Sequence, residues 1–385
     1  MTAAVIAALV AILAVVGLLT GDSDGNGDEA PDEPSVATIA RRLERVRQLR
    51  FDRLPRVRHV SGSQARADAL RDLDRAVPRG ELAAEERLLK LLELLPPGSK
   101  LRDLLGKAFA SVVGGYYMPR TRTLSIVGEG ASGGLLGEIT LAHELTHALE
   151  DQHFGIDSSG STGYRRDSAA AESALHEGTA TIAMVDYVVL QQAGTANVPA
   201  SLREQALNAL DDAVVPESSG LPRYLREGLV FPYATGARLV NRIEGRGGWS
   251  AVDRALKDPP TSSEQVMHPA KYDARERPLR VRVRPPSGAE LIEQGDFGEF
   301  DTEQLLRAAN GRARSRRAAA GWGGGGFALW RVGGDRYGLE LRWVWDRAPD
   351  AREFVSALRR TAKRLDGATV RGSDKAVELA LAPRS

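Results

Sequence analysis

Residues 137–153 read GEITLAHELTHALEDQH, and within this stretch His143, Glu144 and His147 form the pattern HExxH. The stretch looks helical, and on a helix residues four apart lie on one face, one turn above the other. The two imidazoles can therefore hold one metal ion, with Glu144 beside them as a base for water. The pattern indicates a zinc-dependent hydrolase, most often a peptidase. Because five residues can match by chance, the rest of the chain has to support this interpretation.

The composition is typical of a globular protein of two or three domains. The chain has 385 residues, of which 42% are hydrophobic and 27% charged. A formal net charge of +1 gives no electrostatic reason to expect a nucleic acid partner. Cysteine is absent, which excludes disulfides, thiolate zinc ligands and a cysteine nucleophile. We therefore expect Zn²⁺ as cofactor, held by His, Asp or Glu.

The N-terminus predicts a membrane anchor. Residues 2–20 carry no charge, and about 20 apolar residues in a helix can cross a bilayer. Residues 21–35 are acidic and rich in Gly, Pro and Asp, which predicts a disordered linker. No Lys or Arg follows until Arg41, so nothing basic holds the body of the protein inside. We expect residues 1–20 to be a single-pass signal anchor in the cell membrane with the catalytic domain outside the cytoplasm. Cleavage of the segment, which would give a secreted protein, is the alternative.

The remaining sequence predicts an α+β protein. Residues 36–110 have the apolar spacing of amphipathic helices, with a short strand possible in LPRVRHVSG, residues 54–62. Residues 111–285 are predicted as a mainly helical catalytic domain with a small edge sheet. That sheet would contain a hairpin at 112–127, with its turn at Pro119–Arg122.

Further elements are expected downstream. Helical runs are predicted at about 166–192, 201–213 and 235–257. From 286 to 385 we expect a small α+β C-terminal domain, in which two strands, an amphipathic helix and a closing hairpin follow one another.

HExxH supplies two ligands, whereas a catalytic zinc takes three from the protein and one from water. Glu177, within HEGTA, lies on a second predicted helix that a helix–loop–helix can fold back beside the first. We expect Gly178 to let these two helices approach closely. His176 is expected to pack or to form a hydrogen bond rather than to bind metal.

Two other residues compete with Glu177 for the third ligand position. From His143 the chain reads HExxHxxExxH, which would make His153 a ligand if the chain turned back sharply. That turn uses glycine in the three-histidine pattern, and Glu150 resists it. Glu172 is the other candidate. Glu150, Asp151 and Glu172 are also candidates for orienting a ligand histidine.

Several segments resemble a known class of enzymes. HELTHAL, residues 143–149, is similar to the active-site helix of the thermolysin-like zincins, and HExxH followed by EGTA resembles the gluzincins, bacterial collagenases among them. Over residues 40–345 the strings YYMPRTRTLSIV, HELTHALEDQHF, ALHEGTA, FPYATGARLV and SSEQVMHPAKY resemble bacterial exported or membrane-anchored metallopeptidases of unassigned substrate. The resemblance implies a zincin-like domain over 111–285, peptide or protein substrates, and Glu177 as the third zinc ligand. The chain departs from thermolysin in lacking its later Glu-x-x-x-Asp arrangement.

The chemistry implied is hydrolysis of peptide bonds with Glu144 as general base. His268, with Tyr272 close by in MHPAKY, is our first choice as donor to the oxyanion. Residues 122–127 are expected to provide an edge strand for an extended substrate. Residues 36–110 could serve as a prodomain or as part of the fold. The alternative function is a non-catalytic envelope scaffold that retains the fold of a peptidase.

Overall fold

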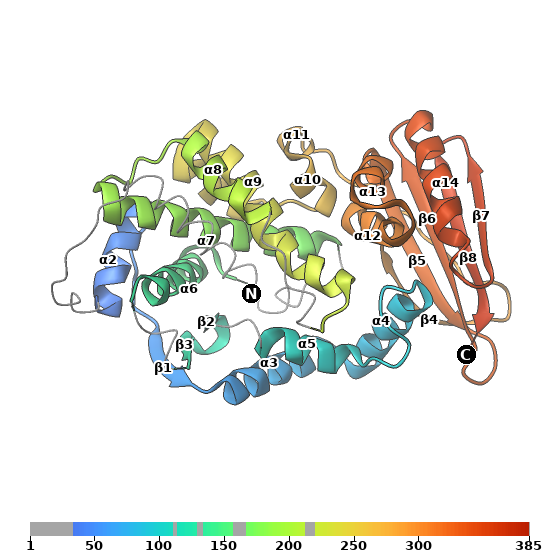
Figure 1. Cartoon of the computed structure of the whole chain (residues 1–385), viewed down its shortest axis with the longest axis horizontal. Helices are drawn as coiled ribbons and strands as arrows, with labels where there is room; N and C mark the ends of the chain where they lie inside the picture. The colour runs from blue at the N-terminus through green and yellow to red at the C-terminus, as the bar shows by residue number, and fades with distance from the viewer. Residues whose placement is uncertain (1–33, 111–113, 129–133, 157–166, 212–219, 385) are drawn as a thin grey trace.

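The computed structural model describes residues 34–110, 114–128, 134–156, 167–211 and 220–384. Helices and two separate sheets confirm the predicted α+β class (Figure 1). The predicted anchor and nearly all of the predicted linker lie outside the described residues. Among the described helices, none is both long and apolar enough to cross a membrane.

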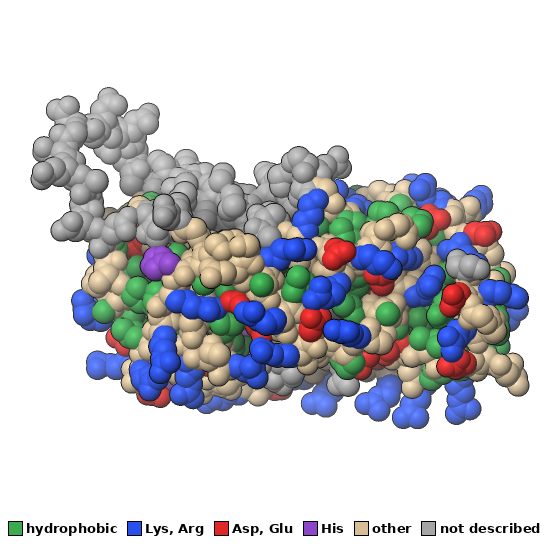
Figure 2. Space-filling model, turned by 90° about the horizontal axis from the view of Figure 1, so that it is seen from below, with side chains coloured by type: hydrophobic (Ala, Val, Ile, Leu, Met, Phe, Trp, Pro, Cys, Tyr) green, Lys and Arg blue, Asp and Glu red, His purple; other side chains and the backbone are tan. Residues whose placement is uncertain are grey.

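The first part of the chain is mainly helical. Its elements are α2 (Val36–Arg47), β1 (Arg56–Val60), α3 (Gly62–Ala76), α4 (Arg79–Leu91) and α5 (Leu101–Ala110). Helix α3 begins at a capping box, in which the side chains of Ser61 and Gln64 each accept the other's backbone N–H. The three helices α3, α4 and α5, which we call the helical arm, lie along the lower side of the molecule (Figure 1). Viewed from below, basic, acidic and apolar side chains are interspersed over this face (Figure 2).

A small sheet follows, and it corrects one prediction. Strand β2 (Gly115–Met118), the 3₁₀ turn η1 (Pro119–Thr121) and β3 (Thr123–Val127) form the predicted hairpin, and the predicted strand at β1 is also present. The strand order is β1-β3-β2, with β1 parallel to β3. The expectation that 122–127 is an edge strand is therefore wrong, because β1 pairs with β3 along the side that would have been free. The edges belong to β1 and β2.

Four helices build the central layer. They are α6 (Gly134–Phe154), α7 (Asp167–Ala193), α8 (Ala200–Asp211) and α9 (Arg223–Lys257). Helix α9 begins well before the predicted residue 235 and continues through Pro232. Proline removes one helical hydrogen bond, but the burial of Phe231 and Tyr233 on either side compensates for it. The helical geometry is interrupted instead at Gly247–Gly248.

The predicted role of Gly178 is also corrected. A Cβ on Gly178 would overlap the carbonyl group of Gly236 and lie 2.7 Å from the amide nitrogen of Ala237. The close approach is therefore between α7 and α9, and not between α6 and α7. A Cβ on Gly236 would in turn overlap the carbonyl group of Ala174, so neither glycine can carry a side chain without separating the helices.

The C-terminal unit is a sheet covered by helices. It follows the short helices α10 (Ser263–Met267) and α11 (Pro269–Asp273), and its elements are β4 (Glu290–Asp296), α12 (Glu299–Asn310), α13 (Arg312–Ala319), β5 (Trp322–Arg331), β6 (Tyr337–Trp345), α14 (Ala348–Ala362), β7 (Ala368–Ser373) and β8 (Ala376–Arg384). The antiparallel strands have the order β4-β5-β6-β8-β7. The two predicted strands, the amphipathic helix and the closing hairpin are confirmed. Strand β4 and helices α12 and α13 were not predicted.

The two larger hydrophobic cores among the described residues hold these parts together. One lies between α2, α6, α7, α9 and the small sheet. The other fills the C-terminal unit and also takes in Leu89 of α4, Leu101 of α5 and Leu225 of α9. The helical arm therefore bridges the central layer and the C-terminal unit, and a cavity lies among all three.

Candidate metal centre

Helices α6 and α7 bring three predicted ligands together. The Nε2 atom of His143 lies 3.1 Å from Oε2 of Glu177 and 3.2 Å from Nε2 of His147. The Nε2 atom of His147 lies 3.4 Å from the same Glu177 oxygen. Each residue thus offers one donor atom to a common point, and the three make up one of the two groups of potential metal ligands among the described residues.

The size of this triangle fits a zinc ion. Zinc–nitrogen and zinc–oxygen bonds of about 2.0–2.1 Å at tetrahedral angles place neighbouring ligand atoms about 3.3 Å apart. The observed separations of 3.1, 3.2 and 3.4 Å agree with that value. Three lone-pair-bearing atoms at this spacing repel one another unless a proton or a cation lies among them. A zinc ion held by these three atoms would keep a further position for water or substrate.

Local structure explains the position of the histidines. Every residue from 141 to 150 is buried, so this part of α6 lies inside the protein. The four-residue spacing places His143 and His147 on one face, with their rings edge to face at 4.9 Å between centroids. The Nδ1 atom of His143 is buried without a hydrogen-bond partner among the described residues. The ring is therefore positioned by packing rather than by a second hydrogen bond.

Burial and mutual contact govern the charges in the cluster. Burial lowers the pKa of His143. For His147 burial opposes the charged form, but Glu177 outweighs it and raises the pKa to about 9. For Glu177 burial likewise opposes the charge, and His147 and His143 outweigh it and hold the pKa well below its ordinary range. A protonated His147, an imidazolium, paired with the Glu177 carboxylate is the arrangement that a metal cation would replace.

Glu144 lies in a different environment from the three ligand candidates. Its Oε2 atom accepts a hydrogen bond from the backbone N–H of Tyr117 at 2.9 Å. Its Oε1 atom is buried and has no hydrogen-bond partner among the described residues. Burial raises the pKa of the Glu144 carboxyl to about 8. One oxygen is thus fixed by the edge strand β2 and the other remains available to a proton.

The competing ligand candidates are not part of the cluster. His153 is exposed, and its Nε2 atom lies 2.7 Å from the carbonyl oxygen of Arg50. Helix α6 continues through residue 150, so the chain makes no sharp turn there that would bring His153 back. Glu172 lines the adjacent cavity but is not grouped with the two histidines.

Glu150 has a structural contact that also explains His176. The Nδ1 atom of His176 lies 3.2 Å from Oε2 of Glu150, which confirms the predicted hydrogen bond. Glu150 is fully buried, and the guanidinium of Arg47 lies 3.6 Å from its other oxygen. Arg47 in turn bonds Asp253 at 3.0 Å. This buried network fixes the residue immediately before Glu177.

The assignment of His268 needs correction. Its Nε2 atom forms a hydrogen bond with Oε1 of Glu299 at 2.8 Å, at the junction of α10 and α11. His268 neither joins the metal-ligand group nor lines the cavity. The hydroxyl of Tyr272 donates to the carbonyl of Asp258 at 3.0 Å. Both side chains therefore form hydrogen bonds with other parts of the protein, away from the metal-ligand group.

Tyr233 is the residue of this site that the sequence did not reveal. Its ring stacks on that of His143, with centroids 5.9 Å apart and an interplanar angle of 24°. Its hydroxyl lies beside the Glu177 carboxylate, and burial raises its pKa well above the ordinary value. The only signal was its position three residues before Gly236, where α9 meets α7.

A cavity of about 1030 Å³ opens onto this cluster. Glu144, His147, Glu177 and Tyr233 are in its wall. Arg120 and the neighbouring residues of β2 and η1 line one part of the cavity, and other parts are lined by residues of β1, α3, α4, α5, α7, α9, α12 and β5. These four side chains therefore line a cavity of the size expected for a ligand.

A second acidic group has a simpler explanation. Glu264, Glu276 and Asp346 lie close enough to hold a cation. The ammonium of Lys271 lies 2.5, 2.7 and 2.5 Å from their respective carboxylates. Lysine thus already provides the positive charge in this group.

Comparison with known proteins gives one match. Residues 289–382 match a family described as a domain of unknown function, DUF8575. No curated protein and no solved structure matches the chain. The match covers β4 to β7, α12 to α14 and most of β8, which is less than half of the chain. It does not include the candidate metal centre.

Proposed function

We propose that this protein is a zinc metallopeptidase with a zincin-like catalytic domain. The observation that carries the proposal is the triangle of His143, His147 and Glu177 donor atoms at 3.1–3.4 Å, beside Glu144 in the wall of a large cavity. Two imidazoles and one carboxylate with one open position are the donor set of hydrolytic zinc sites. The N-terminal sequence supports a membrane-anchored protein with this domain outside the cytoplasm.

Each side chain of the site has a separate role in the proposed hydrolysis. Zn²⁺, when bound, supplies a Lewis acid that polarises the scissile carbonyl and acidifies water. His143, His147 and Glu177 would hold it. Glu144 accepts the proton of the attacking water on its free oxygen and passes it to the leaving amine. A carboxyl whose pKa burial raises to about 8 is suited to both acceptance and donation near neutral pH.

Tyr233 replaces His268 as donor to the oxyanion. Its hydroxyl is next to Glu177 and faces the same cavity as Glu144. A phenol with a raised pKa stays protonated and can donate a hydrogen bond to developing negative charge. The stacked ring of His143 restricts the movement of the Tyr233 ring.

A peptide is the substrate class that the surroundings favour. Strand β2 is an edge of the small sheet and carries Tyr117, whose N–H holds Glu144. An extended peptide can add to such an edge and place its backbone beside the base. The alternative of a non-catalytic scaffold gives no reason for a buried carboxylate with an unpaired oxygen beside the histidines, since burying it costs free energy.

Metal removal tests the proposal. The purified full chain, in detergent, is assayed against a mixed library of quenched fluorescent peptides before and after treatment with a chelator. We expect about one zinc per chain, loss of cleavage on chelation and recovery on addition of zinc. A protein that binds no zinc, or that cleaves equally well without it, would show that the proposal is wrong and favour the scaffold.

A further inference from the structure

We propose that the C-terminal unit forms the specificity wall of the cavity and selects peptides with a large apolar side chain near the scissile bond. This inference rests on the proposed peptidase function and goes beyond it by giving a role to residues 289–382, the region matched by a family of unknown function.

The wall consists of aromatic side chains. Phe297 and Phe300, at the start of α12, and Phe327 on β5 line the same cavity as Glu144 and His147. Phe297 and Phe327 are buried. Phe297 is also held in place, because the indole N–H of Trp322 donates to its carbonyl oxygen and the ring of Trp343 packs edge to face on its ring at 5.9 Å between centroids. Rigid aromatic surface inside a reactive cavity favours an apolar group of the ligand.

The aromatic wall begins close to the metal centre. The rings of Phe300 and Phe231 are 4.6 Å apart between centroids, which joins α12 to α9. Two residues further along α9, a rise of about 3 Å, Tyr233 stacks on His143. Phe231 and Tyr233 both line the cavity. An extended peptide advances about 3.3 Å per residue, so a side chain within a few residues of the scissile bond can reach Phe300.

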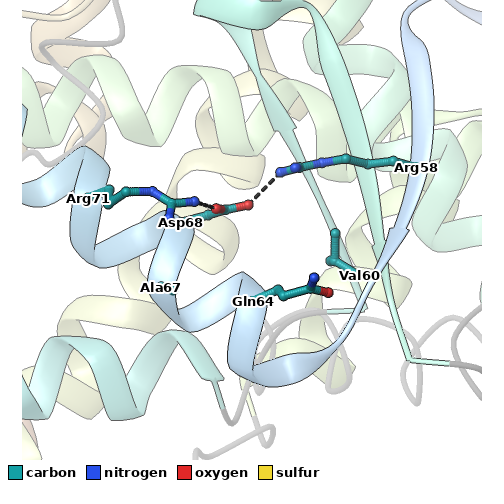
Figure 3. Close-up of a pocket in the computed structure, with 6 residues that line it drawn as sticks. All are labelled: Arg58, Val60, Gln64, Ala67, Asp68 and Arg71. Carbon is teal, nitrogen blue, oxygen red and sulfur yellow. Dashed lines mark hydrogen bonds and ion pairs between the residues drawn. The ribbon is translucent and has the colours of Figure 1, made fainter.

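The helical arm forms another part of the wall. Leu88 and Leu89 of α4 and Leu105 of α5 line the cavity, and they pack in the same hydrophobic core as Phe297 and Phe327. Near the small sheet, Asp68 of α3 accepts hydrogen bonds from Arg58 and Arg71, as Figure 3 shows, and also one from the hydroxyl of Tyr116 at 2.6 Å. These contacts fix α3 against the small sheet and so hold this part of the cavity wall in place.

The C-terminal unit contributes no basic side chain to the described wall of the cavity. The arginines that line the cavity lie on β1, α3 and η1, whereas the C-terminal unit contributes aromatic side chains together with Asp296 and Asp301. Asp301 accepts a hydrogen bond from the hydroxyl of Tyr224 at 2.9 Å, and this polar contact is made within the protein. Burial of a large apolar side chain against the aromatic faces gives selectivity of about 10- to 100-fold over a small or polar one.

The test compares peptides that differ at one position. Peptide series carry Phe, Leu, Ser or Asp in turn at each of four positions on either side of the scissile bond, and kcat/KM is measured for the zinc-loaded full chain. We expect one position at which Phe and Leu are favoured by at least about 10-fold. Phe300→Ala should remove most of that preference with zinc content unchanged, and Phe300→Leu should restore much of it.

Leu291→Ala is the matched control. Leu291 belongs to the same unit, but it is 41% exposed and does not line the cavity. This variant should keep the wild-type preference. Affinity for an uncleaved Phe-containing peptide, measured on zinc-loaded Glu144→Gln with and without Phe300→Ala, should fall in parallel with the selectivity.

The outcomes separate the two proposals. Cleavage without an apolar preference, or a preference that Phe300→Ala leaves intact, overturns the specificity wall while the peptidase function stands. Absence of zinc-dependent cleavage of every peptide overturns the peptidase function and the specificity wall with it.

Discussion

Gly178 of α7 and Gly236 of α9 lie in close backbone contact at the crossing of the two helices, and this contact positions two side chains of the proposed metal centre. A Cβ on either residue would overlap the backbone of the other helix. Glu177 precedes Gly178 directly, and Tyr233 lies three residues before Gly236. The crossing therefore sets the carboxylate and the phenol at one side of His143.

Gly178→Ala should destabilise the protein and weaken zinc binding. Overpacking in a core costs about 1–3 kcal/mol, more than the gain in helix propensity of about 1 kcal/mol. Gly228→Ala on α9 is the control, since its Cβ would meet nothing within 4 Å. Denaturant unfolding and zinc titration check both variants. Equal stability of Gly178→Ala and the wild type would contradict the account of the crossing.

Substitution of the ligand candidates should separate them clearly. Glu177→Gln should weaken zinc binding by at least about 100-fold, because a neutral amide replaces the only anionic ligand. His153→Ala should leave zinc affinity unchanged, since His153 is exposed and contacts Arg50. Competition with a chromophoric chelator measures both. The reverse ranking would assign the third position to His153.

Tyr233→Phe should lower kcat by about 10- to 1000-fold with little change in KM or zinc content. The phenylalanine ring keeps the stacking on His143, and only the donor to the oxyanion is lost. Steady-state kinetics on one good peptide substrate suffice. An unchanged kcat would mean that the oxyanion is stabilised by another group.

Asp167 predicts a pH dependence of stability. Burial raises the pKa of its carboxyl from 3.8 to about 7. Between these values the folded state retains the proton and the unfolded state loses it, so this residue's contribution to stability falls as pH rises. Asp167→Asn should remove the effect, and its free energy of unfolding should gain on the wild type by up to roughly 4 kcal/mol between pH 4 and pH 8.

Urea unfolding at several pH values measures this difference. Other carboxylates titrate alike in both proteins and cancel. An Asn oxygen can still accept the hydrogen bond that the backbone N–H of Ser263 gives to Asp167 at 3.0 Å. Parallel curves for the two proteins would contradict the assignment of a raised pKa.

The sequence predicted the part of the site that depends on helix geometry. A helix alone is enough to place His143 and His147 on one face. Glu177 reaches them if a second helix folds back beside the first. Tyr233 was missed because its place depends on the α7–α9 crossing, a contact between backbones without a side-chain pattern. His268 was misassigned because a histidine in a loop gave no information on its partner, which proved to be Glu299.

The same distinction holds for the fold. Alternation predicted β5 and β6, which lie within the sheet and are largely buried. Strand β4 was missed because it is an edge strand with mostly exposed side chains, and such a strand needs no apolar alternation. The strand order β1-β3-β2 could not be predicted from the sequence, because β1 pairs with β3 across more than 60 residues of chain.

Hydrolysis by Glu144→Gln is the most direct test of the zinc peptidase account. Glutamine keeps the shape and the contact with the N–H of Tyr117 but cannot accept the proton of water. We predict that the variant retains about one zinc per chain and loses at least about 100-fold in kcat. Zinc-loaded Glu144→Gln that cleaves peptides at the wild-type rate would contradict the account.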